Sequence, residues 1–261
     1  MHDPLEGVTS LGTIKTGAHR DRVSARYRPV LEGAISAVRA ADPDSSLYVY
    51  GSVATGMARL PESDVDLLTV GLSTAAAGAI ARRLSRQFAD LSRAVDVAAA
   101  QSSDFAGETD EAYGGRVFLR HYCVHLSGPD LHSGLPQYAA DVRAARGFNG
   151  DIARQAGRWR AELNEGCDPG QLGRRIARKS LLAVAGLVSV HDKTWTTDRA
   201  RAAARWAETE PSHADELLML LAWSGGESIA DRGSVAAALD GIVAHIGRSF
   251  ATSVGLWDRT G

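Results

Sequence analysis

Two aspartates separated by a single residue, Asp64 and Asp66, lie in the segment SDVDLLTVGL, which has the composition of a β-strand. Because side chains alternate along a strand, both carboxylates should emerge on one face while Val65 and Leu67 point into a core. Two adjacent carboxylates repel each other, and a divalent cation relieves that repulsion; Mg²⁺ favours one or two carboxylates together with substrate phosphates. The pair therefore predicts a magnesium site.

A phosphate site is predicted just upstream, where Gly51 and Ser52 follow the strand-like segment SLYVYG and open a short helix. Free N–H groups and the positive end of the dipole make the start of a helix an anion site. Gly51 lets the backbone approach the anion, and Ser52 adds a hydroxyl donor. Gly56 and Arg59 are expected to keep the following connection tight and positive. The metal and phosphate sites should face one another.

The segment GSVATGMARLPESDVDLL resembles the Gly-Ser, then Asp-x-Asp signature of the DNA polymerase beta-like nucleotidyltransferase superfamily. A third acid, Asp96 in RAVDVAAA, stands where that family has one on a later strand. The resemblance covers roughly residues 47–135. It implies transfer of a nucleoside monophosphate from a nucleoside triphosphate to a hydroxyl, with two Mg²⁺ ions held by Asp64, Asp66 and Asp96.

The resemblance also implies a role for each residue. Asp64 and Asp66 would bridge both ions, Asp96 would complete one metal site and is a candidate to accept the acceptor's proton, and Gly51 and Ser52 would hold the triphosphate. Asp96 between two valines also fits a surface charge on an alternating strand, and an Asp-x-Asp pair also fits a solvated edge strand. The catalytic interpretation is favoured because all these residues occur together.

The expected fold class is α/β (α+β), with a small mixed sheet flanked by helices in a catalytic domain at 1–136 and an all-α bundle at 137–261. In the first domain the pattern predicts helices at 19–42 and 74–91, a short helix after Gly51, strands at 46–51, 63–72, 94–100 and 116–128, and a loop at 101–115. In the second it predicts helices at 152–163, 172–190, 197–210, 214–225 and 234–257.

The helical half resembles the aminoglycoside adenylyltransferases that modify streptomycin and spectinomycin, through the segment LLAVAGLVSVHDKTWTTDRARAAARWAETEP. That resemblance implies ATP, or another nucleoside triphosphate, as donor and a small polyhydroxylated acceptor, an aminoglycoside. Lys193 in this segment is either a solvated lysine or, by resemblance, a ligand of the β- and γ-phosphates. Those enzymes usually carry glutamate at the third acidic position, where this chain has the shorter Asp96.

The charge distribution leaves a rival acceptor open. The whole chain has a net charge of -2 and a pI near 6.4, so it has no global basic field of the kind that draws proteins to nucleic acid. Residues 141–206, however, hold 13 Lys and Arg against 7 Asp and Glu, which suits transfer to RNA or tRNA, or to a protein hydroxyl. If those arginines face outward, Asp192, Asp198 or Glu208 would suit an amino sugar. A non-catalytic nucleotide-binding protein is disfavoured because all three carboxylates are present.

The remaining polar candidates fit no site pattern. Cys123 and Cys167 have no metal or redox spacing, and both are predicted to be reduced thiols. His121 and His125, on one face of the predicted strand, form no complete ligand set with His132, so all three are interpreted as structural.

Two tryptophans and the apolar segments complete the sequence-based picture. Trp159 and Trp195 could stack on a base or a sugar, but packing is the favoured interpretation. The longest apolar run, 181–190, is too short to cross a bilayer, and the N-terminal residues lack a signal pattern. We therefore expect a cytoplasmic protein without a membrane partner.

Overall fold

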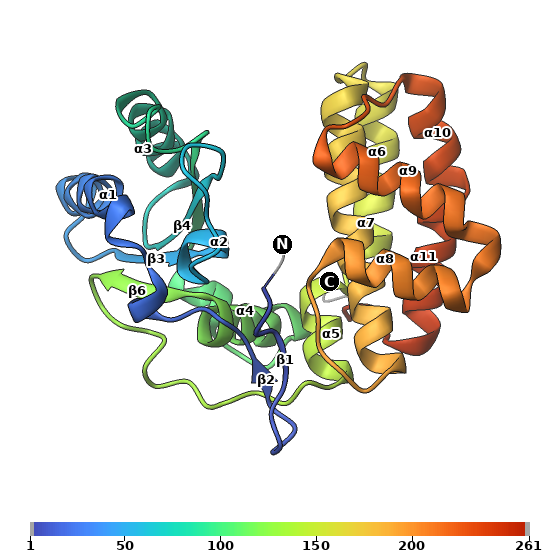
Figure 1. The fold of residues 1–261 in the computed structure, drawn as a ribbon, viewed down its shortest axis with the longest axis horizontal. Coiled ribbons are helices and arrows are strands. Elements are labelled where there is room, and N and C mark those ends of the chain that lie inside the picture. The colour runs from blue at the N-terminus through green and yellow to red at the C-terminus, as the bar shows by residue number, and fades with distance from the viewer. Residues whose placement is uncertain (1–2, 259–261) are drawn as a thin grey trace. The chain divides into compact units, whose positions relative to one another are not determined.

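The computed structural model describes residues 3–258, and these fall into two compact units. The first runs up to Glu108 and resumes at Gly115–Tyr138; the second comprises Thr109–Gly114 and the chain from Ala139 onward. The fold class is α+β, as predicted, with a small mixed sheet and flanking helices in the first unit and helices in the second (Figure 1).

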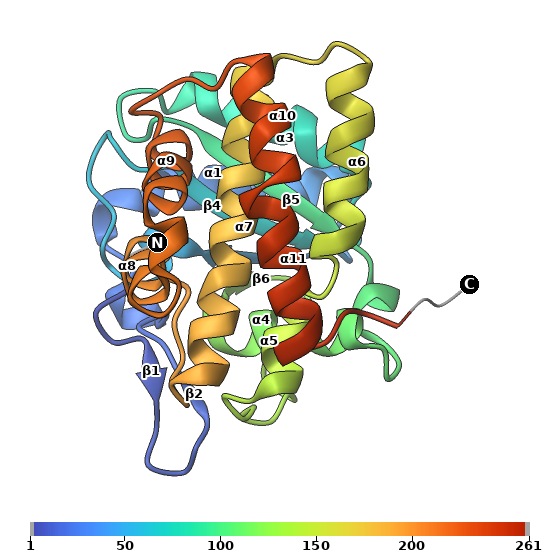
Figure 2. The ribbon, with the colours of Figure 1, turned by 90° about the vertical axis from the view of Figure 1, so that its right-hand side faces the viewer.

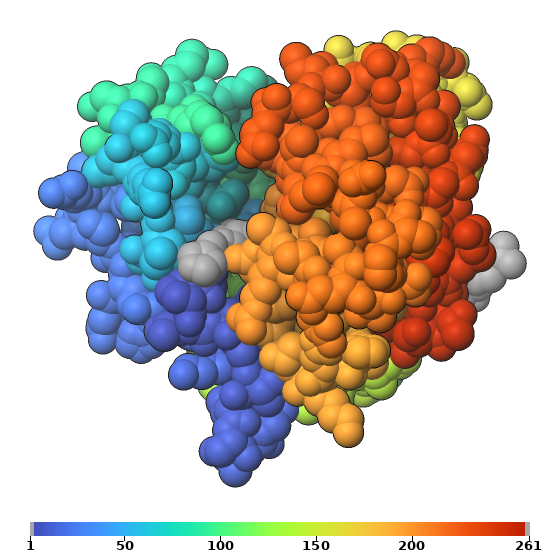
Figure 3. All heavy atoms as spheres, turned by 45° about the vertical axis from the view of Figure 1, so that its right-hand side comes forward, coloured from blue at the N-terminus to red at the C-terminus, as the bar shows by residue number. Residues whose placement is uncertain are grey.

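The first unit is built on a four-stranded sheet in the order β5-β4-β3-β6, in which only β4 and β5 are parallel. Its elements are β1 (Gly7–Val8), β2 (Ile14–Lys15), the 3-10 turns η1 (Arg20–Arg22) and η2 (Ala25–Tyr27), α1 (Arg28–Ala41), β3 (Ser46–Tyr50), α2 (Gly51–Ala54), β4 (Val65–Val70), α3 (Thr74–Gln87), β5 (Val95–Ala100), η3 (Ser102–Phe105), α4 (Asp110–Tyr122) and β6 (Val124–Ser127). Strands β1 and β2 form a separate hairpin, whose tip projects in dark blue at the lower edge of Figure 3.

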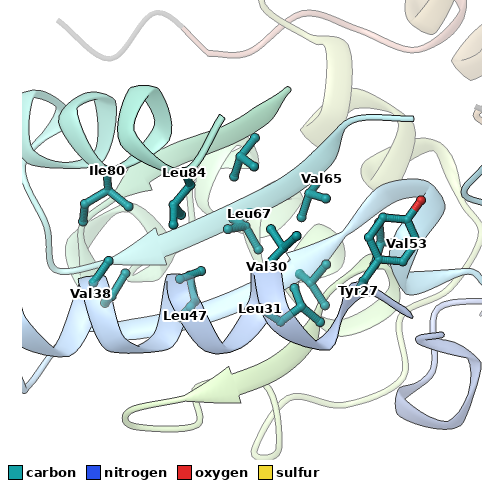
Figure 4. Packing of buried hydrophobic residues seen from close by; sticks show 14 of the residues in the cluster. Tyr27, Val30, Leu31, Val38, Leu47, Val53, Val65, Leu67, Ile80 and Leu84 are labelled. Carbon is teal, nitrogen blue, oxygen red and sulfur yellow. The ribbon is translucent and has the colours of Figure 1, made fainter. Parts of the chain in front are cut away.

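Both faces of the sheet are covered by apolar side chains. On one face, Leu47 and Leu67 of the strands pack against residues of α1 and α3 such as Val30 and Leu84, all fully buried (Figure 4). On the other face Tyr48 and Leu68 pack against Leu119 and Cys123 at the end of α4. As predicted, Val65 and Leu67 point into the core. Asp66, which alternates with Val65 and Leu67, therefore lies on the α4 side of the sheet.

Two boundaries in the first unit differ from expectation. The predicted strand 116–128 is wrong over its first half, because α4 continues to Tyr122 and only Val124–Ser127 is strand. The side chains of Phe118 and Tyr122, one helical turn apart, stack at 5.9 Å between ring centroids. The predicted loop 101–115 contains the start of this helix, where the Thr109 hydroxyl caps the N–H of Ala112.

A further difference concerns the predicted helix 19–42, which is regular only from Arg28 onward. The first part forms the two 3-10 turns, and a proline in the first turn of α1 fixes its start.

The second unit contains α5 (Val142–Asn149), α6 (Ile152–Asn164), α7 (Pro169–His191), α8 (Arg199–Thr209), η4 (Pro211–His213), α9 (Ala214–Gly225), α10 (Arg232–Asp240) and α11 (Ile242–Ser253). Helix α7 contacts each of the other α-helices of this unit from α5 to α11. Figure 2 shows it among α6, α9, α10 and α11. Helix α5 was not predicted, and the expected single helix 234–257 is divided at Gly241, whose ψ of -103° is not helical. Within residues 3–258, no helix has the length and apolar character needed to span a membrane.

Candidate functional site

A row of three polar side chains crosses the sheet where β4 and β5 begin. Asp66 is paired with Asp96 on the parallel strand β5 and with Tyr50 on the antiparallel strand β3. Because residues paired in register share a face, all three side chains emerge on the α4 side of the sheet. Asp66 is half-buried, whereas Asp96 is exposed. Burial, followed by the charge of Asp66, raises the pKa of Tyr50, so this phenol keeps its proton at neutral pH.

Asp64 precedes β4 and makes a two-point contact with Arg93, which precedes β5. Arg93 Nε donates to Oδ1 of Asp64 at 2.9 Å, and Nη2 donates to Oδ2. The hydrogen bond and the charge of Asp64 raise the pKa of Arg93, and the charges of Asp96 and Asp66 act in the same direction. Arg93 thus serves as a counter-ion for the three aspartates. The sequence pattern predicted no role for Arg93, although Arg93 visibly precedes the strand that carries Asp96.

The fit to a divalent ion depends on Asp64. No group of three or more His, Cys, Asp or Glu side chains within the described part of the chain is arranged to hold a metal. Asp66 and Asp96 are neighbours in register and have the oxygen chemistry that Mg²⁺ prefers. A three-carboxylate site would require Asp64 to exchange Arg93 for the ion.

The turn after β3 supplies the candidate phosphate site. Gly51 is buried and adopts a φ of 76°, a conformation that favours glycine. The Ser52 carbonyl accepts the N–H groups of Met57 and Ala58 at 2.9 and 3.0 Å, which fixes the turn. Helix α2 has only four residues, so its dipole is small and the local N–H groups and the Ser52 hydroxyl are the relevant donors. This turn directly follows Tyr50, the partner of Asp66 in the sheet.

The two predicted basic residues lie in different units. Arg59 is exposed in the loop before β4, where its N–H donates to the Ser63 hydroxyl at 2.9 Å and its carbonyl accepts the Ser63 N–H at 2.8 Å. Lys193 belongs to the second unit, in an exposed turn after α7 with a φ of 52°. The structure thus brings the carboxylates, Gly51 and Ser52 into one region of the sheet, and it places Lys193 in the other unit.

The histidine interpretation needs one correction. His121 and His125 do not share a strand face, because His121 lies in α4 and His125 in β6. His121 is buried, and its Nε2 accepts the N–H of Tyr138 at 3.0 Å. This contact agrees with the predicted structural role of His121. Burial is the main cause that lowers the pKa of His121 to about 4.

The cysteine and tryptophan predictions are confirmed. Cys123 and Cys167 are free thiols. Trp159 and Trp195 are buried, at 4% and 3% exposure, and Trp195 meets Phe148 edge-on at 5.6 Å between ring centroids. Both indoles therefore serve packing.

Ion pairs occupy much of the charge in the second unit. Arg205 contacts both Asp192 and Glu208 at 2.8 Å, and Asp198 caps the first turn of α8. The basic segment 141–206 is likewise neutralised in part: Arg143 and Arg146 pair with Asp110, Arg160 with Asp240, Arg175 with Glu162, and Lys179 with Asp151. The excess positive charge of this segment is therefore balanced in part by acids outside it.

Comparison with known proteins supports the fold. No protein-family model matches the chain, and no curated protein matches it. Among solved structures, spectinomycin adenyltransferase AAD(9) from Enterococcus faecialis, crystallised with ATP and spectinomycin, is similar with a TM-score of 0.55. The two share 10% sequence identity, and the match covers 85% of this chain and 98% of that one. At this identity the likeness shows the fold alone, which this chain shares with that spectinomycin adenyltransferase.

Proposed function

We propose that the chain is an Mg²⁺-dependent nucleotidyltransferase that moves a nucleoside monophosphate, AMP, from its triphosphate to a hydroxyl of a small polyhydroxylated acceptor, an aminoglycoside. The observation that carries this proposal is the parallel register of Asp66 and Asp96 beside the Gly51-Ser52 turn. The fold shared with an adenylyltransferase supports the same reaction class.

In this proposal the carboxylates hold the metal ions and the turn holds the phosphates. Asp64, Asp66 and Asp96 supply the oxygen ligands, and the Ser52 hydroxyl with the adjacent N–H groups binds the triphosphate. Bound Mg²⁺ neutralises the phosphates and lowers the pKa of an acceptor hydroxyl. In this proposal Asp96, the exposed member of the row, accepts the acceptor's proton.

The geometry of the proposed reaction is an in-line attack. The acceptor oxygen forms a bond to the α-phosphorus while the bond to the bridging oxygen of pyrophosphate breaks. Fixing the triphosphate at Ser52 aligns these atoms, so much of the rate enhancement should come from positioning. Lys193 remains a candidate ligand of the departing phosphates.

The ion pairs of the second unit do not by themselves decide between an amino sugar and RNA as acceptor, although they occupy much of the basic segment. The carboxylates that sequence analysis singled out for an amino sugar are also engaged: Asp192 and Glu208 bind Arg205, and Asp198 caps a helix. The acceptor preference therefore rests on the fold likeness and on the absence of a strong basic excess in the whole chain.

The test is nucleotide transfer from α-³²P-labelled ATP, GTP, CTP and UTP with Mg²⁺ to streptomycin, spectinomycin, tRNA and total protein. Wild type is compared with Asp66→Asn and, as a matched control, with Asp90→Asn, which removes an exposed carboxylate outside the row. We expect label on an aminoglycoside with wild type and Asp90→Asn, and none with Asp66→Asn. Label on tRNA or protein alone would reject the acceptor, and the absence of Mg²⁺-dependent transfer to any acceptor would reject the reaction class.

A further inference from the structure

A cavity of about 900 Å³ lies within the first unit. It is formed by the β1–β2 hairpin, the start of η1, the end of α4, β6 and the loop that follows β6. Three permanent cations, Lys15, Arg20 and Arg120, line it, and Asp130 is the only acid among its described lining residues. Four histidines also line it: His19, His121, His125 and His132. The lining is therefore strongly basic, although the whole chain is slightly acidic.

Arg120 lines this cavity beside His132. Its Nη1 lies 3.3 Å from Nε2 of His132. Its Nε is buried and has no hydrogen-bond partner within the part of the chain that the structure describes. What Arg120 offers to an anion in the cavity is therefore the positive charge of its guanidinium, rather than this buried N–H.

The other two cations lie on separate elements. Arg20 donates from Nη2 to the carbonyl of His125 at 2.8 Å, which fixes its guanidinium beside β6. Lys15 is exposed on β2. Cations from β2, η1 and α4 thus converge on one space, which no single stretch of sequence would reveal.

Two of the histidines lie close to these cations. His125 donates from Nε2 to the carbonyl of Gly128 at 3.0 Å. Burial and the charge of Arg120 lower the pKa of His132, His125 acts in the same direction, and Asp130 opposes them. A bound anion beside Arg120 would offset the charge of Arg120 and so raise the pKa of His132. His121, which accepts the Tyr138 N–H, lines the cavity as a neutral imidazole.

We propose that this cavity is a binding site for a phosphate-bearing small molecule, separate from the site of nucleotidyl transfer. Its volume is in the range of small-molecule pockets, and guanidinium, ammonium and imidazolium groups are the side chains that bind phosphate. None of Gly51, Ser52, Asp64, Asp66 and Asp96 lines it. The proposal does not depend on the reaction proposed above.

The test is a titration with inorganic pyrophosphate in EDTA and at constant ionic strength, so that no Mg²⁺-dependent binding at the carboxylates contributes. The histidine ring resonances of the whole protein are followed by NMR and assigned with single His→Gln variants, and heat is measured in parallel. We expect saturable shifts of the His132 and His125 resonances, with a rise in the pKa of His132. Arg120→Gln should weaken binding about tenfold or more, because it removes a charge-assisted donor.

Three further variants make the result decisive. Arg26→Gln removes an exposed cation that does not line the cavity, and Ser52→Ala alters the phosphate turn; both should bind as wild type does. The double variant Lys15→Gln, Arg20→Gln changes only exposed residues and should weaken binding even if Arg120→Gln fails to fold. The proposal is overturned if the His132 and His125 shifts do not saturate, if the cavity variants bind as tightly as wild type, or if Ser52→Ala alone abolishes binding.

Discussion

Arg93 binds Asp64 through two hydrogen bonds, so one of the three aspartates of the candidate site is already engaged by a cation. The arginine side chain is 63% exposed and that of Asp64 is 21% exposed. Solvent screens the exposed guanidinium, so a divalent ion with its higher charge can compete for the carboxylate. Arg93 therefore acts as a replaceable counter-ion in this structure.

Replacing Arg93 with glutamine should increase Mg²⁺ affinity. The variant removes the arginine that competes with Mg²⁺ for Asp64. The Mg²⁺ affinity should rise about two- to fivefold, which corresponds to the free energy of one surface ion pair. Mg²⁺ binding is measured by calorimetry, with Arg86→Gln as control because it removes an exposed cation from α3. An unchanged or weaker affinity in Arg93→Gln would show that Asp64 does not take part in metal binding.

Asp96→Asn should abolish nucleotide transfer and leave the fold intact. The carboxylate is exposed, so its loss should shift the melting temperature by no more than about 2 °C. Transfer should fall about a thousandfold or more, because metal ligation and proton acceptance are both lost. Activity and thermal unfolding are measured on the same preparation. Activity within about tenfold of wild type would show that Asp96 is a surface charge without a catalytic role.

Gly56→Ala and Gly157→Ala should change stability in opposite directions. Gly56 has a φ of 73°, and a Cβ there would lie 2.9 Å from the Arg22 carbonyl oxygen. We expect a loss of about 1–3 kcal/mol in the free energy of unfolding. Gly157 is exposed inside α6 with open space around it, so alanine there should add about 0.5–1 kcal/mol. Urea unfolding measures both, and equal effects would contradict the assigned conformations.

His121 should make stability depend on pH in acid. Its pKa is about 4 in the folded protein and about 6.5 when unfolded. Below pH 6.5 the unfolded state therefore binds more protons at His121 than the folded state does. The free energy of unfolding that is present above pH 6.5 falls as the pH falls toward 4. His121→Gln should remove up to about 3 kcal/mol of this loss between those values. Urea unfolding from pH 4.5 to 7.5 measures the difference, with the exposed His19→Gln as control. Parallel profiles for His121→Gln and wild type would refute the shift.

Local sequence pattern predicts the parts of this structure that depend on local periodicity. Alternation in the β4 segment identified Val65 and Leu67 as core residues, and helical spacing identified most helices of the second unit. The end of α4 was missed because residues such as Val117 and Phe118 have high strand propensity. Packing of Leu119 and Cys123 on the sheet overrides that preference.

The features that could not be predicted depend on contacts between distant segments. The role of Arg93 follows from the register of β4 and β5, which places its guanidinium beside Asp64, 29 residues away. The basic cavity likewise requires the hairpin, α4 and the loop after β6 to come together, bringing Lys15 and Arg120 to one space. Such pairings are set by tertiary structure, for which a single sequence carries little direct signal.

Helix α4 has a practical consequence for any attempt to divide the chain. Its first residues, up to Gly114, are counted with the second unit, and the rest of the helix with the first. Gly114 lies against Gly147 of α5 so closely that a Cβ on Gly114 would be 2.3 Å from the Gly147 backbone. A gene fragment ending near residue 136 would separate that first turn from its glycine partner. Fragments made by a single cut should therefore be tested as a co-expressed pair, because neither half carries a complete set of contacts for this helix.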